Sequence, residues 1–339
     1  MSSTSSGPLM IDIAGSALSE LDRARLCHPL VGGLILFSRN YESPEQLARL
    51  TAEVHALRCP PLLIAIDHEG GRVQRCRKGF TRLPAMRCLG LEWEKDPAQA
   101  ITVARDLGYL LAAELRACGV DLSFTPVLDL DWGRSRVIGD RAFHRSPAAV
   151  VDLSRALIEG LHGAGMSACG KHFPGHGWVE PDSHVDLPVD ERRLEEMALD
   201  LEPYRRLSLD AVMPAHVIYR RVDERPAGFS PFWLALLRDE LRFAGTIFSD
   251  DLSMAGAGVA GGPVERCTAA WQAGCDMLLL CNSPASVDDV LHKWDAEPDA
   301  QRAQRIQRLA PRGKSPDWSE LRGQPAYLAG VVAAERLAV

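Results

Sequence analysis

Short apolar runs recur along the chain, and stretches with helical spacing separate them. Most of these runs are continuously apolar, which is the pattern expected when both faces of a parallel strand are covered. Each run therefore predicts a buried strand. The eight predicted strands cover residues 9–13, 33–37, 62–67, 120–128, 167–173, 211–217, 245–251 and 275–281.

The segments between the runs begin alike, with a side chain that can cap a helix followed by proline at the first helical position. The pairs are Ser43-Pro44, Asp96-Pro97, Ser146-Pro147, Ser230-Pro231 and Ser283-Pro284. In the first segment, Gln46 fits a capping box with Ser43. Apolar residues then repeat at helical spacing and are expected to face a sheet, at Leu47, Leu50, Val54 and Leu57.

Strand followed by helix, eight times, predicts an α/β fold and specifically a (β/α)8 TIM barrel. A doubly wound open sheet is the alternative, but residues 14–17 do not supply its glycine fingerprint after the first strand. No low-complexity linker divides the chain, so we expect a single catalytic domain over residues 1–339. The stretch from about 295 to 339 is expected to form a C-terminal helical extension packed on the barrel.

Composition excludes several classes of function. Of 339 residues, 46% are hydrophobic and 24% are charged, as in globular proteins with a sizeable core. The net charge of −7 and the lack of a Lys/Arg-rich stretch argue against a nucleic-acid surface. The first apolar stretch follows no basic segment and is too short to span a membrane. We expect a cytoplasmic protein without a nucleic-acid or membrane partner, and a monomer by default.

The nine cysteines are scattered, without a Cys-x-x-Cys pair. Cys169, Cys275 and Cys281 lie in strand-like runs, as small buried apolar residues do. Because the number of cysteines is odd and their spacing does not match a disulfide framework, we expect reduced thiols in a reducing compartment.

Ionisable residues cluster at the carboxyl ends of the predicted strands, where barrel enzymes hold their active sites. Strand three ends in Asp67, strand five in Lys171 and His172, and strand seven in Asp250 and Asp251. Six of the ten histidines lie in these segments, at positions 68, 144, 172, 176, 184 and 216. One polar site with contributions from several strands explains this concentration.

Each candidate also has a purely structural interpretation. A lone Asp67 would be expected to cap a turn, and Arg77 and Lys78 to lie on a solvated loop face. His216, inside an apolar strand, is more often a hydrogen-bonded core histidine than a catalytic residue. The aspartates at 250–251 could cap a helix.

The loop after strand five carries His176, Asp182 and His184 in a segment rich in proline and glycine. A carboxylate orients an imidazole and stabilises its charged form, which favours a functional role for these histidines. A zinc site that includes His172 is the alternative. Because the spacing lacks the regularity of a His-Glu-x-x-His helix, we expect no metal.

Five stretches of the chain match one family in the right order: residues 28–37, 67–73, 171–177, 213–216 and 248–254. With them the chain resembles the family 3 glycoside hydrolases, and within that family the single-domain bacterial β-N-acetylhexosaminidases of peptidoglycan recycling. The likeness runs from about residue 9 to about residue 283.

The resemblance implies a retaining exo-β-N-acetylglucosaminidase that needs no cofactor. It would hydrolyse terminal N-acetylglucosamine from peptidoglycan-derived anhydro-muropeptides through a covalent glycosyl-aspartate intermediate. By the same resemblance, Asp250 is the nucleophile, and His184 with Asp182 provides the general acid/base. The implied sugar-binding residues are Asp67, Arg75, Arg141, Lys171 and His172.

The residue types suit this chemistry. Histidine titrates near neutral pH, so it can give a proton in one step and take one back in the next. Because His184 lies in a loop rich in glycine and proline, we predict that it is far from Asp250 without ligand. His68 stands where relatives often have glutamine and is expected at the edge of the site.

Three other functions stay open at this point. One is a β-glucosidase-type exo-glycosidase of the same family, and another is a metal-dependent amidohydrolase on a similar barrel. The third is a sugar-binding module without catalytic activity.

Overall fold

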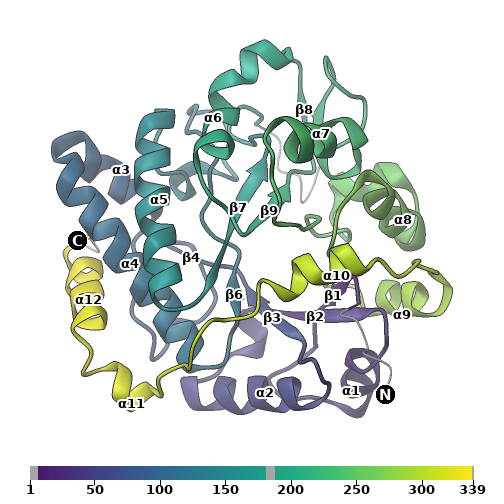
Figure 1. The fold of residues 1–339 in the computed structure, drawn as a ribbon, viewed down its shortest axis with the longest axis horizontal. Coiled ribbons are helices and arrows are strands. Elements are labelled where there is room, and N and C mark those ends of the chain that lie inside the picture. Colours follow the sequence, from purple (N-terminus) through teal and green to yellow (C-terminus); the bar gives the residue numbers. More distant parts are fainter. Residues whose placement is uncertain (1–6, 181–187, 338–339) are drawn as a thin grey trace.

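The computed structural model describes residues 7–180 and 188–337. Eight parallel strands form one sheet in the order β11-β9-β7-β6-β3-β2-β1-β12. A parallel bridge between Phe248 and Met277 joins the two ends of this sheet, so it closes into a barrel surrounded by helices (Figure 1). The strands are β1 (Leu9–Ile11), β2 (Val31–Leu36), β3 (Leu63–Ile66), β6 (Leu122–Ser123), β7 (Ser167–Phe173), β9 (Ala211–Pro214), β11 (Thr246–Ile247) and β12 (Leu278–Leu280).

Each of the eight apolar runs overlaps one of these strands, although β2 begins at Val31, before its run, and the predicted (β/α)8 barrel is confirmed. The runs are continuously apolar because the two faces of each strand pack against different cores. In β1, for example, Met10 joins the cluster inside the barrel, whereas Leu9 and Ile11 join the cluster between the sheet and the helices. Both faces are therefore withdrawn from water, as in other parallel sheets.

Helices follow the strands and cover the outside of the barrel (Figure 1). They are α1 (Glu20–Leu26), α2 (Pro44–Ala56), α3 (Met86–Lys95), α4 (Pro97–Ala117), α5 (Pro147–Gly163), α6 (Ala198–Arg206), α7 (Pro231–Ala235), α8 (Pro263–Ala273) and α9 (Pro284–Lys293). Two short pairings lie outside the barrel: β4 (His68–Gly70) with β5 (Val73–Gln74), and β8 (Val189–Asp190) with β10 (Ile218–Tyr219).

The predicted helix starts are correct, and each helix has proline in its first turn. The side chains of Ser43, Asp96 and Ser230 each accept a backbone N–H of the first turn, as predicted for capping residues. The predicted caps at Ser146 and Ser283 are wrong, because these side chains make no capping hydrogen bond to a described residue. The predicted capping box is wrong in one respect. The side chain of Gln46 accepts the N–H of Glu42 at 2.9 Å, one residue before the cap.

The chain ends in three further helices, α10 (Ala300–Gln307), α11 (Trp318–Leu321) and α12 (Pro325–Leu337). Ile306 and Leu309 belong to the apolar cluster inside the barrel, so α10 packs against its interior. The last helix, α12, lies along α4 (Figure 1). No helix in the described part of the chain has the length and apolarity needed to cross a bilayer.

Three aspartates at the amino ends of strands bind neighbouring strands. Each accepts a backbone N–H: Asp121 from Ile64 at 2.8 Å, Asp210 from Ala168 at 2.9 Å and Asp276 from Ile247 at 2.8 Å. Each also contacts basic side chains, which are His55 for the first, His162 for the second, and Arg238 and Arg305 for the third. Bonds to a charged acceptor are stronger than neutral ones, so these aspartates oppose slippage between strands.

Candidate functional site

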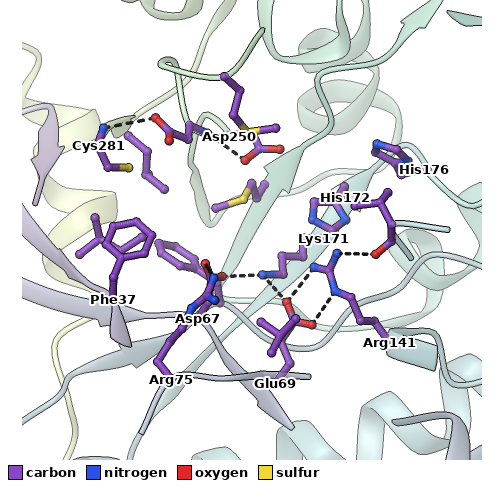
Figure 2. Close-up of a pocket in the computed structure, with 18 of the residues that line it drawn as sticks. Phe37, Asp67, Glu69, Arg75, Arg141, Lys171, His172, His176, Asp250 and Cys281 are labelled. Carbon is purple, nitrogen blue, oxygen red and sulfur yellow. Dashed lines mark hydrogen bonds and ion pairs between the residues drawn. The ribbon is translucent and has the colours of Figure 1, made fainter. Parts of the chain in front are cut away.

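A cavity of about 540 Å³ opens at the carboxyl ends of the barrel strands. It brings together six of the eight residues predicted for the site, and Figure 2 shows them around one space. The charged and imidazole side chains in its lining are Asp67, Glu69, Arg72, Arg75, Arg141, Lys171, His172, His176, Asp250 and Asp251.

Five of these side chains form one ion network, whose Lys171 and Glu69 are buried. The Lys171 ammonium at the end of β7 binds Asp67 at 2.8 Å and Glu69 at 2.7 Å. Arg141 donates two parallel hydrogen bonds to Glu69, both at 2.8 Å. Glu69 is only 2% exposed, so it holds two cations in fixed positions beside the cavity (Figure 2). Bidentate pairs of this kind restrict geometry as well as adding energy.

The network keeps its members charged at neutral pH. Burial by itself would raise the pKa of Asp67, but Lys171 and Arg75 outweigh it and hold that pKa well below its usual range. In the same way, Arg141 and Lys171 overcome burial and lower the pKa of Glu69 to about 2. Burial would lower the pKa of Lys171, but Asp67 and Glu69 raise it above its ordinary value. The cavity wall therefore offers fixed charges of both signs to a polar ligand.

Arg75 and Asp67 add a donor and an acceptor to this wall. Arg75 Nη2 donates to Asp67 at 3.3 Å. Its Nε is buried and has no hydrogen-bond partner among residues 7–180 and 188–337. A buried donor without a hydrogen-bond partner is energetically costly.

Asp129 holds the imidazole of His172 from behind. Its carboxylate contacts His172 Nδ1 at 2.7 Å and accepts the backbone N–H of His176 at 2.7 Å. The Asp129 side chain is fully buried. Burial would raise its pKa, but His172 and His176 lower it below the ordinary value. His172 is therefore oriented at one ring nitrogen by a charged acceptor, as catalytic and binding imidazoles often are.

The two aspartates after β11 have different surroundings. The Asp251 carboxylate accepts hydrogen bonds from the Ser253 amide and hydroxyl, at 2.9 and 2.8 Å, and from the Cys281 amide at 3.2 Å. It therefore ties the turn after β11 to the end of β12. Asp250 contributes to the cavity lining and lies across the cavity from Glu69 (Figure 2). Asp251 therefore stabilises the turn after β11 and caps none of the described helices, and both aspartates line the cavity.

Asp182 and His184 lie outside the described residues, as does the distance from His184 to Asp250. Their roles stay predictions. Within the described ranges, no group of three or more His, Cys, Asp or Glu side chains is arranged to hold a metal ion.

Several structural interpretations are confirmed, and one expectation is wrong. Arg77 and Lys78 are exposed, and His216 is a buried histidine whose Nε2 contacts the Asp251 carbonyl at 3.0 Å. His68 was expected at the edge of the site. Instead it is buried, and its ring packs on Phe80 with centroids 5.6 Å apart. Successive side chains of an extended segment point in opposite directions, so the His68 side chain points away from the side on which Asp67 lies.

His68 gives a testable pH dependence. Burial, with a smaller effect of Arg75, lowers its pKa from 6.5 to about 3. Because the folded-state pKa lies below the unfolded one, its stabilising contribution is complete above pH 6.5 and is lost as pH falls toward 3. Between these limits, the unfolding free energy of the wild type should fall more steeply than that of His68→Gln, by about 1.4 kcal/mol per pH unit.

Urea unfolding of both proteins at a series of pH values measures this difference. His176, whose pKa burial and His172 lower to about 4, titrates in both proteins and cancels. Parallel stability curves for the two proteins would contradict the prediction.

Two residues of the site, Glu69 and Asp129, lie at the ends of predicted strands but were not among the predicted site residues. Glu69 lies inside the motif of residues 67–73, which was a signal, but its partners Arg141 and Lys171 lie far along the chain. Asp129 follows the fourth apolar run, at the end where site residues are expected. Its contact with His172 depends on the pairing of strands, which no local pattern reveals.

The family described as Glycosyl hydrolase family 3 N terminal domain matches residues 9–310. Among curated proteins, the β-hexosaminidase of Chromobacterium violaceum is 56% identical over 338 residues, which cover 98% of this chain and 95% of that protein. Among solved structures, NagZ from Neisseria gonorrhoeae in complex with N-trifluoroacetyl-D-glucosamine is 49% identical with a TM-score of 0.93, and covers 99% of both chains. The same protein in complex with zinc ion is 48% identical with a TM-score of 0.92, and again covers 99% of both chains.

Proposed function

The chain belongs to glycosyl hydrolase family 3, as its five motifs indicated, and from this premise we propose that it is a retaining exo-β-N-acetylglucosaminidase. Its activity class is that of a glycoside hydrolase, a β-hexosaminidase. One observation carries the finer proposal: Asp250 lines the same cavity as the charged network of Asp67, Glu69 and Lys171. The Asp250 carboxylate thus faces charged side chains that are suited to bind a sugar.

The wall offers what a sugar ring needs. Asp67 can accept hydrogen bonds from two hydroxyl groups, and Arg75, Arg141 and Lys171 can donate to hydroxyl or carbonyl oxygens. Two of the three Lys171 donors already bind carboxylates, which fixes the ammonium in place before a ligand arrives. The gonococcal NagZ, 49% identical to this chain, has been solved with a glucosamine derivative bound. This likeness supports an N-acetylglucosamine-type substrate.

The reaction would proceed in two steps. In the first, a carboxylate oxygen of Asp250 bonds to the anomeric carbon while the glycosidic C–O bond breaks. Its electron pair goes to the departing oxygen, which takes a proton from His184. In the second, water attacks the anomeric carbon, His184 takes the water proton, and the Asp250 carboxylate is released. Asp182 would orient the His184 ring and stabilise its charged form.

For the natural substrate we propose terminal N-acetylglucosamine on peptidoglycan-derived anhydro-muropeptides, on the strength of the family resemblance. We place the enzyme in the cytoplasm, since Cys169, Cys275 and Cys281 are buried free thiols, which suits a reducing compartment. Hydrolysis of an aryl β-N-acetylglucosaminide, compared with an aryl β-glucoside, tests the preference for the acetamido group. We expect EDTA to leave the rate unchanged.

Replacing His184 by alanine should reveal a dependence on the leaving group. A sugar alkoxide needs a proton as it departs, so we expect about a hundredfold loss of kcat/KM on a disaccharide. Dinitrophenolate departs without a proton, so the loss on a dinitrophenyl glycoside should be less than about tenfold. Steady-state kinetics on both substrates measure the contrast. Equal losses would point to another proton donor.

A further inference from the structure

We propose that α11 and α12 hold the loop that carries Arg75 in its sugar-binding conformation. This loop, residues 74–83, is called the Arg75 loop below. Both helices follow residue 310, where the matched family domain ends. The inference rests on the proposed function, because it takes Arg75 as a residue that contacts the sugar.

The Arg75 loop is closed on itself by one buried side chain. Gln74 Nε2 donates to the carbonyl of Cys76 at 3.1 Å and to that of Thr81 at 2.8 Å. Its Oε1 accepts the N–H of Leu83 at 3.0 Å. Gln74 precedes Arg75 directly, so the backbone position of Thr81 is tied to the base of the Arg75 side chain.

The first brace reaches this loop through α4. Glu114 of α4 is 2% exposed, and its carboxylate accepts the Thr81 N–H at 3.0 Å and the Thr81 hydroxyl at 2.7 Å. The hydroxyl of Tyr327 in α12 donates to the same carboxylate at 3.0 Å. A buried carboxylate depends on each of its donors. Tyr327 therefore stabilises the group that holds Thr81.

The second brace is an aromatic contact. Phe80, at the far end of the Arg75 loop, is only 6% exposed, and its ring lies 5.2 Å from that of Trp318 in α11. On other sides it meets Tyr41 and His68, each at 5.6 Å between centroids. His68 follows Asp67 directly, so Phe80 also packs behind the acceptor that Arg75 binds. Aromatic contacts of this geometry add to the energy of burial.

The two braces act on a segment that has little regular structure of its own. If a fraction of molecules releases the loop, the apparent affinity for the sugar falls by that fraction. The contact between Arg75 and substrate exists in both the ground state and the transition state, so its loss should raise KM and leave kcat unchanged. A merely structural role would instead reduce the amount of active enzyme, which lowers kcat at constant KM.

The test uses Trp318→Leu and Tyr327→Phe, singly and together, in the full chain. With an aryl β-N-acetylglucosaminide, we expect the double variant to raise KM roughly tenfold and to keep kcat within about twofold. Leu328→Ala, on the exposed side of α12, should change neither. Val290→Ala in α9 supplies a matched loss of buried volume, and should lower stability at constant KM.

A double-mutant cycle that combines the Trp318→Leu/Tyr327→Phe variant with Arg75→Ala tests whether the change in KM depends on Arg75. If the helices act through Arg75, the double variant should raise KM no further once that side chain is absent. The inference is overturned if KM of the double variant equals that of the wild type, whether or not its kcat falls. A wild type that hydrolyses no aryl N-acetylglucosaminide would instead refute the proposed function, and this inference with it.

Discussion

Asp250→Asn is expected to lower turnover by a factor on the order of 10⁴ or more while the protein stays folded. The amide keeps the size of the side chain but cannot form the glycosyl ester. Because Asp250 lines the cavity beside a wall of fixed charges, its loss should leave sugar binding in place. Steady-state kinetics and the affinity for N-acetylglucosamine, measured on the same preparation, separate the two effects.

The neighbouring aspartate is the matched control. Asp251 caps the turn through Ser253 and Cys281, so Asp251→Asn should lower the stability by about 1 kcal/mol and leave most of the activity. A fluorinated glycoside that traps the covalent intermediate, followed by peptide mass spectrometry, should label position 250. Label on Asp251 or Asp129 would overturn the assignment of the nucleophile.

Glu69→Gln is expected to impair both stability and sugar binding. The substitution removes the charge that holds Lys171 and Arg141. Lys171 keeps its contact with Asp67, whereas Arg141 loses the carboxylate that binds it. Removing one partner from a buried ion pair costs about 3–5 kcal/mol. The two cations would shift, and a displacement of about 1 Å at a site residue can cost on the order of a hundredfold in rate. Urea unfolding and kcat/KM measure the two consequences.

Glu94→Gln is the control for this substitution. Glu94 pairs with a histidine and an arginine, but its side chain is 47% exposed, so its replacement should cost little stability. The pKa of Glu69 is lowered to about 2, so its contribution to stability is complete above pH 4.5 and is lost progressively as pH falls from 4.5 toward 2. The stability difference between wild type and Glu69→Gln should therefore shrink as pH falls below 4.5. A constant difference would contradict the buried pairing.

The fold was predictable because one pattern was repeated. Apolar runs that lack alternation identify strands with both faces buried, and the rhythm of strand and helix then fixes the barrel. The barrel also explains why Asp67, Lys171 and Asp250 could be grouped from the sequence, since each ends a strand. The short observed strands, such as β6 and β11, begin and end inside longer apolar runs. The ends depend on backbone pairing, which residue type does not determine.

What the sequence could not reveal depends on contacts between distant segments. Glu69 acquires its importance from Arg141 and Lys171, and Trp318 from Phe80. Adjacent residues can also have different surroundings: Asp250 and Asp251 are alike in sequence and unlike in hydrogen bonding. His68 was misplaced because neighbouring side chains leave the backbone in different directions.

The aspartates at the amino ends of the strands have a consequence at the opposite end of the barrel. Each of the amides they bind lies three positions before a charged residue of the cavity: Ile64 before Asp67, Ala168 before Lys171, and Ile247 before Asp250. Three residues of strand span roughly 10 Å. The three aspartates at the amino ends of the strands therefore help to fix the positions of Asp67, Lys171 and Asp250 relative to one another along the barrel axis. Substitutions of these three aspartates would change the alignment of the reacting groups, although none of the three would contact the sugar.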